Sequence, residues 1–170
     1  MKQAPQSAVH LPSATVRDAE GRLVSLAIEY GLSANATGDN TWLVAIDGSD
    51  YGQNAVTEAL RLARTMKDCT LHLVNVQHWM SKEAAESVLL AQGLAATKKA
   101  LALLGQAGVP SCLHVVMGDA AESIAALAEQ LGCHGIVIGS RGLGAAENLL
   151  LGSVAQQVIH SSRIAVLVVR

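Results

Sequence analysis

Glycine and serine residues bracket a loop near the end of the chain, in the segment GSRGLGAAENLLLGS at 139–153. Gly139 closes the apolar run GIVIG, Gly142 follows it, and the pair Gly152-Ser153 comes just before a helix-like segment. Flexible backbone at both ends of such a loop lets free N–H groups turn toward an anion, and a helix N-terminus adds partial positive charge. The spacing therefore predicts phosphate binding, and a nucleotide is the first ligand to test.

Asp47 is the second candidate binding residue. It directly follows the apolar run WLVAI, in the segment AIDGSD. In open α/β sheets, ligands bind beyond the carboxyl ends of the strands, where the strand order reverses. If the runs that end at Asp47 and Gly139 form central neighbouring strands, these two residues lie side by side. Asp47 would then accept a hydrogen bond from a ribose hydroxyl or hold a metal ion. The alternative is a local turn in which Ser49 or Asp50 caps the next helix.

Ser153 also has two interpretations. The pattern Ser153-x-x-Gln156 is that of a capping box, so the hydroxyl could simply close the helix that follows. Gly152 could likewise serve tight packing alone. The strand pattern before the loop and the helix pattern after it favour the phosphate interpretation.

The elements that must position these residues alternate along the chain. Five apolar runs have the length of strands, at 42–46, 71–76, 112–117, 135–139 and 164–169. Helical patterns separate or precede them at 50–66, 81–106, 119–131 and 153–161, and Asp119 with Glu122 forms a capping box. This alternation predicts an α/β fold, an open five-stranded parallel sheet with helices on both faces. An apolar last strand at the sheet edge predicts a homodimer that pairs this strand with its copy.

Residues 1–40 differ from the rest, beginning with a polar, proline-containing stretch and ending with the linker-like ANATGDN. We expect an N-terminal extension over 1–40, partly disordered with a short helix, and a domain over 41–170. The helix is predicted by an apolar stripe at spacings of three and four, interrupted by Gly21: Val16, Ala19, Leu23, Leu26 and Tyr30. A frayed or weakly docked tail is the alternative.

Composition narrows the function classes. The chain has 170 residues, 51% of them hydrophobic and 15% charged, with a net charge of −2. This balance lacks the basic footprint of a nucleic-acid binder. The N-terminus lacks the apolar segment of a signal peptide, and polar residues break the longest apolar run. We therefore expect a cytoplasmic protein that binds neither nucleic acid nor membranes.

The cysteines and histidines show no ligand spacing along the chain. Cys69, Cys112 and Cys133 are widely separated without a CxxC pair, and the six histidines form neither HxH nor HExxH. This predicts reduced, buried cysteines and no zinc site made by cysteine and histidine side chains.

The loop motif resembles that of a known family. The form Gly139-x-x-Gly142, nine residues, then Gly152-Ser153 is similar to the nucleotide motif of universal stress proteins. The segments VAIDGSDYGQNAVTEAL, LHLVNV, VVMGDAAESI and IAVLVVR are also similar to that family, so that the resemblance covers residues 42–170.

The resemblance implies a sheet of order 3-2-1-4-5, a homodimer through the last strand and binding of ATP, or of ADP or AMP. Magnesium would be bound through the phosphates, with Asp47 as a further ligand. Ala45 and Val76 would line the adenine pocket, and Asp47 would meet the adenosine half. The phosphate region would comprise the motif and its flanks: Gly139, Ser140, Arg141, Gly142, Gly152, Ser153 and Val154.

The loop departs from the family in its charge. Many members carry Lys or Arg before LLLGS, whereas this chain has AAEN at 145–148, which leaves Arg141 as the only cation against Glu147. Because charge-assisted bonds are the strong ones, this implies weaker binding, greater dependence on Mg²⁺, or a bias toward AMP or ADP.

Three functions follow from these patterns. The first is a nucleotide-binding stress or signalling protein, and the second is a stress-protein interaction module that binds no nucleotide. The third is a slow ATPase. The chain has neither the P-loop pattern nor an SGGxDS loop, and no residue stands out as a general base, so efficient catalysis is not expected.

Overall fold

A computed structural model describes residues 11–144, 146, 148 and 150–170. Its strands are β1 (Ala14–Arg17), β2 (Leu23–Tyr30), β3 (Asn40–Ala45), β4 (Cys69–Gln77), β5 (Ser111–Met117), β6 (Gly135–Gly139) and β7 (Ala165–Val169). Its helices are α1 (Asp50–Thr65), α2 (Lys82–Gln106), α3 (Ala120–Gln130) and α4 (Ser153–Ser161). All nine elements predicted between residues 42 and 170 are present, with small shifts at their ends.

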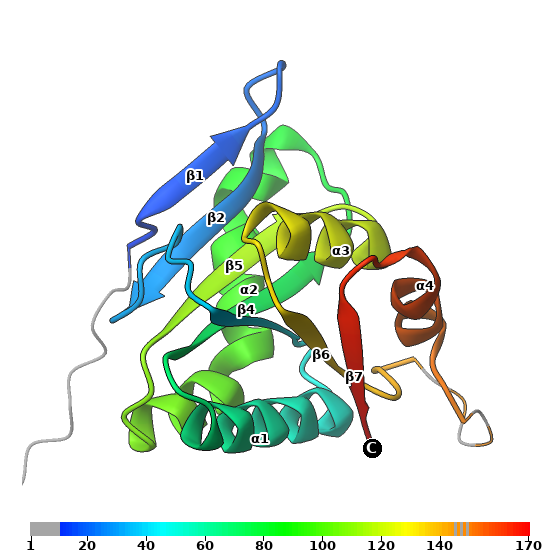
Figure 1. The fold of residues 1–170 in the computed structure, drawn as a ribbon. Coiled ribbons are helices and arrows are strands. Elements are labelled where there is room, and N and C mark those ends of the chain that lie inside the picture. Colours follow the sequence, from blue (N-terminus) through cyan, green and yellow to red (C-terminus); the bar gives the residue numbers. More distant parts are fainter. Residues whose placement is uncertain (1–10, 145, 147, 149) are drawn as a thin grey trace, which may run out of the picture.

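The strands form a single sheet in the order β1-β2-β5-β4-β3-β6-β7 (Figure 1). Its last five members are parallel and have the implied 3-2-1-4-5 order, so the α/β fold with an open sheet is confirmed. The strand number and the purely parallel pairing were wrong. The sheet has seven strands and is mixed, because β2 pairs antiparallel with β5 and β1 pairs antiparallel with β2.

The predicted helix in the N-terminal region is also wrong, since its apolar stripe belongs to the hairpin β1–β2. The turn of this hairpin is built around Asp18, whose Oδ1 accepts hydrogen bonds from the N–H groups of Glu20 and Arg22. Gly21 has a φ of +76°, a backbone conformation that glycine adopts without steric cost. Residues 1–10 of the predicted extension lie outside the described residues.

Two apolar layers fix the helices on opposite faces of the sheet. Helices α1 and α2 pack on one face, in a core that includes Val44, Leu73, Leu89 and Leu113. Helices α3 and α4 pack on the other face, in a core around Leu43, Ile136 and their neighbours. Strands with apolar side chains on both faces are typical of parallel sheets between two helical layers.

Side-chain caps determine where three helices begin. Ser49, Ser81 and Asp119 accept hydrogen bonds from N–H groups in the first turns of α1, α2 and α3. The predicted capping roles of Ser49 and Asp119 are therefore confirmed. Helix α2 has the length and apolar composition of a membrane span, and one side of it, which includes Leu89 and Leu104, packs against the sheet.

Strand β7 is the last member of the sheet on the side opposite the hairpin (Figure 1). Ala165 is exposed and the other four residues are half-buried, although all five are apolar. Its inner edge pairs with β6, while its outer edge has no strand beside it among the described residues.

Candidate functional site

The loop at 139–153 starts where two central strands end. Strands β3 and β6 are parallel neighbours, with Val44 opposite Val137, so their carboxyl ends meet at the same edge of the sheet. Asp47 follows β3 and Gly139 ends β6. A direct hydrogen bond, 3.0 Å long, joins the N–H of Leu143 in the loop to Oδ2 of Asp47. The structure thus brings together the two segments that the sequence placed at the switch point.

Both carboxylate oxygens of Asp47 are engaged. Oδ1 accepts hydrogen bonds from the N–H of Ser49 at 2.9 Å and from its hydroxyl at 2.6 Å, in addition to the bond that Oδ2 accepts from Leu143. A carboxylate can accept about four hydrogen bonds, of which the described residues fill three and leave one position for a further donor. The local turn role and a ligand role are therefore compatible in this half-buried side chain.

Two glycines of the motif are required for close packing. A Cβ on Gly142 would lie 2.6 Å from Oδ2 of Asp47, and a Cβ on Gly139 would lie 2.7 Å from the backbone of Tyr51. Neither glycine has a positive φ, so space rather than backbone conformation explains the residue type. Any side chain at 142 must displace the Asp47 carboxylate.

Backbone hydrogen bonds hold together the two ends of the loop, Ser140 and Gly152, which we call its neck. The N–H of Gly152 donates to the carbonyl of Ser140 at 2.7 Å, and the N–H of Ser140 donates to the carbonyl of Val169 at 2.6 Å. These two N–H groups therefore cannot serve a phosphate while the neck is closed, unlike the donor role expected for Gly152. A Cβ on Gly152 would lie 3.2 Å from Cα of Arg141, which again indicates close packing.

Helix α4 begins immediately after this neck, with Gly152 as its N-cap and no side-chain capping bond. The capping-box interpretation of Ser153 is therefore wrong, because Ser153 is the first helical residue and its side chain is exposed. The first N–H groups of any α-helix lack acceptors within the helix. The N–H groups of Ser153 and Val154, together with the Ser153 hydroxyl, lie at this end of α4.

Arg141 is directed toward α1. Its guanidinium donates a hydrogen bond to the hydroxyl of Tyr51 at 3.2 Å and lies over the Tyr51 ring, 5.6 Å from the centroid. This contact holds the half-buried arginine beside the loop. Glu147, the predicted opposing charge, lies outside the described residues.

Ala45 and Val76 share one face of the sheet, in the apolar layer that also contacts α3 and α4. Ala45 is opposite Val74 on β4, so Val76 lies one side-chain repeat farther toward the carboxyl edge. Ala45 is 8% exposed and Val76 is half-buried. They supply an apolar surface near Asp47, as an adenine ring would need.

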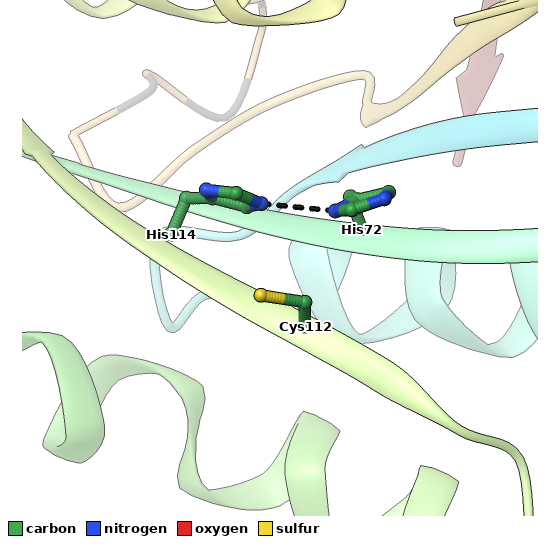
Figure 2. A group of neighbouring side chains, drawn as sticks. All are labelled: His72, Cys112 and His114. Atoms are coloured by element: carbon green, nitrogen blue, oxygen red, sulfur yellow. Dashed lines mark hydrogen bonds between the residues drawn. The ribbon is translucent and has the colours of Figure 1, made fainter. Parts of the chain in front are cut away.

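A second group of chemically active side chains was not predicted. His72 on β4 lies with Cys112 and His114 of β5, and their potential ligand atoms are all within 4.8 Å of one another (Figure 2). The prediction of no metal site considered only linear spacing. The sequence feature that could have revealed the cluster is Cys-x-His inside a strand, because alternate residues of a strand point to the same face.

Burial changes the acid–base behaviour of this cluster. Desolvation lowers the pKa of His72, and desolvation with the neighbouring His72 lowers the pKa of His114 to about 4. Desolvation, and then the negative charge of Glu29, raises the pKa of the Cys112 thiol to about 12. Both imidazoles are therefore neutral and the thiol is protonated near neutral pH.

Comparisons with known proteins agree with the fold and identify a family. The family model described as "Universal stress protein family" matches residues 40–170. A universal stress protein of Methanocaldococcus jannaschii is 29% identical over 160 residues, covering 86% of this chain and 94% of the relative. One from Thermus aquaticus is 33% identical over 136 residues, covering 76% of this chain and 98% of the relative.

Among solved structures, a universal stress protein in complex with cAMP is 26% identical and has a TM-score of 0.61. The match covers 77% of this chain and 97% of that one. Together with the sheet order and the loop between β6 and α4, these matches show that the chain belongs to the universal stress protein family.

Proposed function

We propose that the protein binds an adenine nucleotide at the loop between β6 and α4, and that occupancy is coupled to a stress or signalling response through a homodimer. The observation that carries the proposal is the start of α4, which has no side-chain cap and packs through Gly152 against Ser140 and Arg141, next in the chain to the Gly142–Asp47 contact. There, a helix N-terminus and the exposed Ser153 hydroxyl adjoin the carboxyl edge of the two central strands. This combination favours an anionic ligand attached to a group that Asp47 can hydrogen-bond.

The proposed pose divides the ligand into three parts. The adenine ring packs on the apolar surface of Ala45 and Val76, and a ribose hydroxyl donates to the remaining acceptor position of Asp47. The phosphates accept hydrogen bonds from the N–H groups of Ser153 and Val154 and from the Ser153 hydroxyl. Ser140 and Gly152 act through the backbone bonds that hold the neck closed, rather than as phosphate donors. The relative solved with cAMP supports the choice of an adenine nucleotide.

The charge near the loop sets the expected affinity. Arg141 already donates to Tyr51, so a phosphate would have to share or redirect this guanidinium. A triphosphate then depends on backbone donors and on Mg²⁺ bound through its own oxygens. We therefore expect ATP to require Mg²⁺ and AMP or ADP to depend on it less.

Binding can be measured by equilibrium dialysis or calorimetry with ATP, ADP and AMP, each with and without Mg²⁺. Gly142→Ala should weaken binding at least about tenfold, because the new methyl group displaces the Asp47 carboxylate, and one lost charge-assisted bond costs about 1.5–3 kcal/mol. Asp47→Ala should have a similar effect.

Gly144→Ala is the matched control within the same loop. Apart from the chain neighbours, no other described residue has an atom within 4 Å of a Cβ at this exposed position, so affinity should remain unchanged. No saturable binding of any of the three nucleotides at millimolar concentration would exclude the proposal.

A second candidate, an interaction module that works without nucleotide, is favoured by the loop's own bonds. Asp47 to Leu143, Ser140 to Gly152 and Arg141 to Tyr51 hold the loop without any ligand. Mass spectrometry of material released from the purified protein separates the two candidates. Co-purified adenine nucleotide supports the first, and its absence together with negative dialysis supports the second.

A further inference from the structure

We propose that His72, Cys112 and His114 form a binding site for a single divalent transition-metal ion of the zinc class. The site is independent of the proposed nucleotide function. It lies toward the amino ends of β4 and β5, whereas the loop at 139–153 lies at the carboxyl edge of the sheet.

The strand register brings the three side chains together. His72 is directly opposite Cys112 in the parallel pair β4–β5, and Val74 is opposite His114. Because His114 is two residues from Cys112, both point to the same face as His72 (Figure 2). Three ligands thus come from two adjacent, hydrogen-bonded strands, which makes their arrangement rigid.

The separations are close to those of a metal centre. His72 Nδ1 and His114 Nε2 lie 2.9 Å apart, and all three candidate ligand atoms are within 4.8 Å of one another. Tetrahedral zinc with bonds of about 2.0–2.3 Å requires ligand atoms roughly 3.3–3.7 Å apart. Small side-chain rotations therefore suffice to place all three atoms around one ion, and a water molecule would complete the coordination.

The hydrogen bonds of His72 fix its ligand nitrogen. Nε2 lies 2.8 Å from the carbonyl oxygen of Ala36, which can only accept, so Nε2 carries the proton and donates it. Nδ1 therefore has a free electron pair and faces His114 Nε2. Metal-binding histidines commonly donate their second N–H to a backbone carbonyl, which orients the ring and raises its basicity.

The cluster is buried among apolar side chains, and a neighbouring carboxylate favours a cation. His72 and Cys112 are fully buried, and Ala27, Ala34 and Leu32 pack around the thiol. Glu29 lies opposite Cys112 on β2, and its carboxylate, which accepts a hydrogen bond from the N–H of Ala34, places negative charge beside the cluster. The segment between β2 and β3, which includes Ala34 and Ala36, covers the cluster.

Binding requires two proton movements and no redox step. The Cys112 S–H bond is broken, a sulfur–metal bond forms, and the released proton passes to solvent. The proton on His114 Nε2 moves to Nδ1, which changes the tautomer without changing the charge. The product holds the ion through one thiolate sulfur and two imidazole nitrogens, a donor set suited to zinc.

Cobalt(II) is the probe, because a thiolate ligand gives it a near-ultraviolet charge-transfer band and tetrahedral geometry gives intense visible bands. Chelator-treated, reduced protein should bind one Co²⁺ per chain with both signatures, and Zn²⁺ should displace it. Cobalt should be added to the folded protein and, separately, during refolding from urea, since the site is buried. Absence of the thiolate band in both arms would overturn the proposal.

Cys112→Ala should abolish the thiolate band, and His114→Gln should weaken binding at least about tenfold. Cys133→Ala, at another buried cysteine, and His160→Gln, at an exposed histidine, should leave the band and the affinity unchanged. A band that survives Cys112→Ala, or is lost equally in Cys133→Ala, would refute the assignment.

Circular dichroism establishes whether each variant is folded. X-ray absorption of the zinc-loaded unmodified protein needs no variant and should show one sulfur and two imidazole ligands. A shell of oxygen and nitrogen alone would contradict the proposal. Nucleotide binding can fail while the cobalt signal remains, so the two proposals are distinguishable.

Discussion

At the scale of single residues, Asp47 links the two halves of the candidate nucleotide site. Its carboxylate joins the turn after β3 to the loop after β6, and Gly142 leaves the space for it. The sequence predicted that Asp47 and Gly139 would lie side by side if their strands were central neighbours, because the ends of the strands are visible in the chain. It could not predict that the N–H of Gly152 is used inside the neck, since this depends on how the loop closes.

His114 leads to a prediction of how stability depends on pH. Its pKa in the folded protein is about 4, lowered by desolvation and by His72. In the unfolded chain the value is about 6.5, so between these pH values the unfolded chain binds more protons. Stability should therefore fall as the pH falls from about 6.5 to about 4, with His114 contributing a loss of about 2 kcal/mol at about pH 5.

The measurement is urea unfolding with chelator present at about pH 7.5 and about pH 5, and it compares the unmodified protein with His114→Gln, whose amide can still donate to His72. The variant should lose less stability on acidification than the unmodified protein. Equal losses would show that His114 does not contribute to the pH dependence.

At the scale of elements, the hairpin β1–β2 is an integral part of the domain. Leu26 and Ile28 are 2% and 1% exposed and belong to the core beneath α2. The apolar stripe from Val16 to Tyr30 has helical spacing, which favours a helix. The turn residues Asp18 and Gly21 favour a hairpin instead. The turn and the pairing with β5 determine the outcome, and pairing with a distant strand leaves no mark in local spacing.

Ile28→Ala should lower the free energy of unfolding by about 2–5 kcal/mol, the usual cost of emptying a fully buried aliphatic position. Urea unfolding measures this change. Val16→Ala, on the exposed outer strand, is the control and should change stability by less than about 0.5 kcal/mol. A small effect of Ile28→Ala would mean that the hairpin is a dispensable attachment.

At the scale of the whole molecule, the two edges of the sheet are unlike. Strand β7 carries five apolar residues, whereas β1 is short, exposed and irregular in register between Val16 and Arg17. Short, charged or bulged edges resist pairing with another chain. The alternation of strands and helices predicted that β7 forms one edge of the sheet. It did not predict the opposite edge, which the hairpin β1–β2 forms beyond β5.

The proposed homodimer should therefore form through β7. Leu167 is the central residue of this strand, and Leu167→Lys would bring two like charges toward the two-fold axis of a β7–β7 pair. Light scattering at micromolar concentration should report a dimer for the unmodified protein and a monomer for this variant. Val16→Lys, at the opposite edge, should remain dimeric. A monomeric unmodified protein would rule the dimer out.

The irregular outer strand of the hairpin also bears on how many subunits could join edge to edge. A subunit with two competent sheet edges can add neighbours on both sides and extend without end, as fibrils do. Among the described residues β1 blunts one edge, so the proposed association through β7 would be complete with two copies. The hairpin would thereby limit the proposed assembly to a pair, and its loss would leave a subunit able to form filaments.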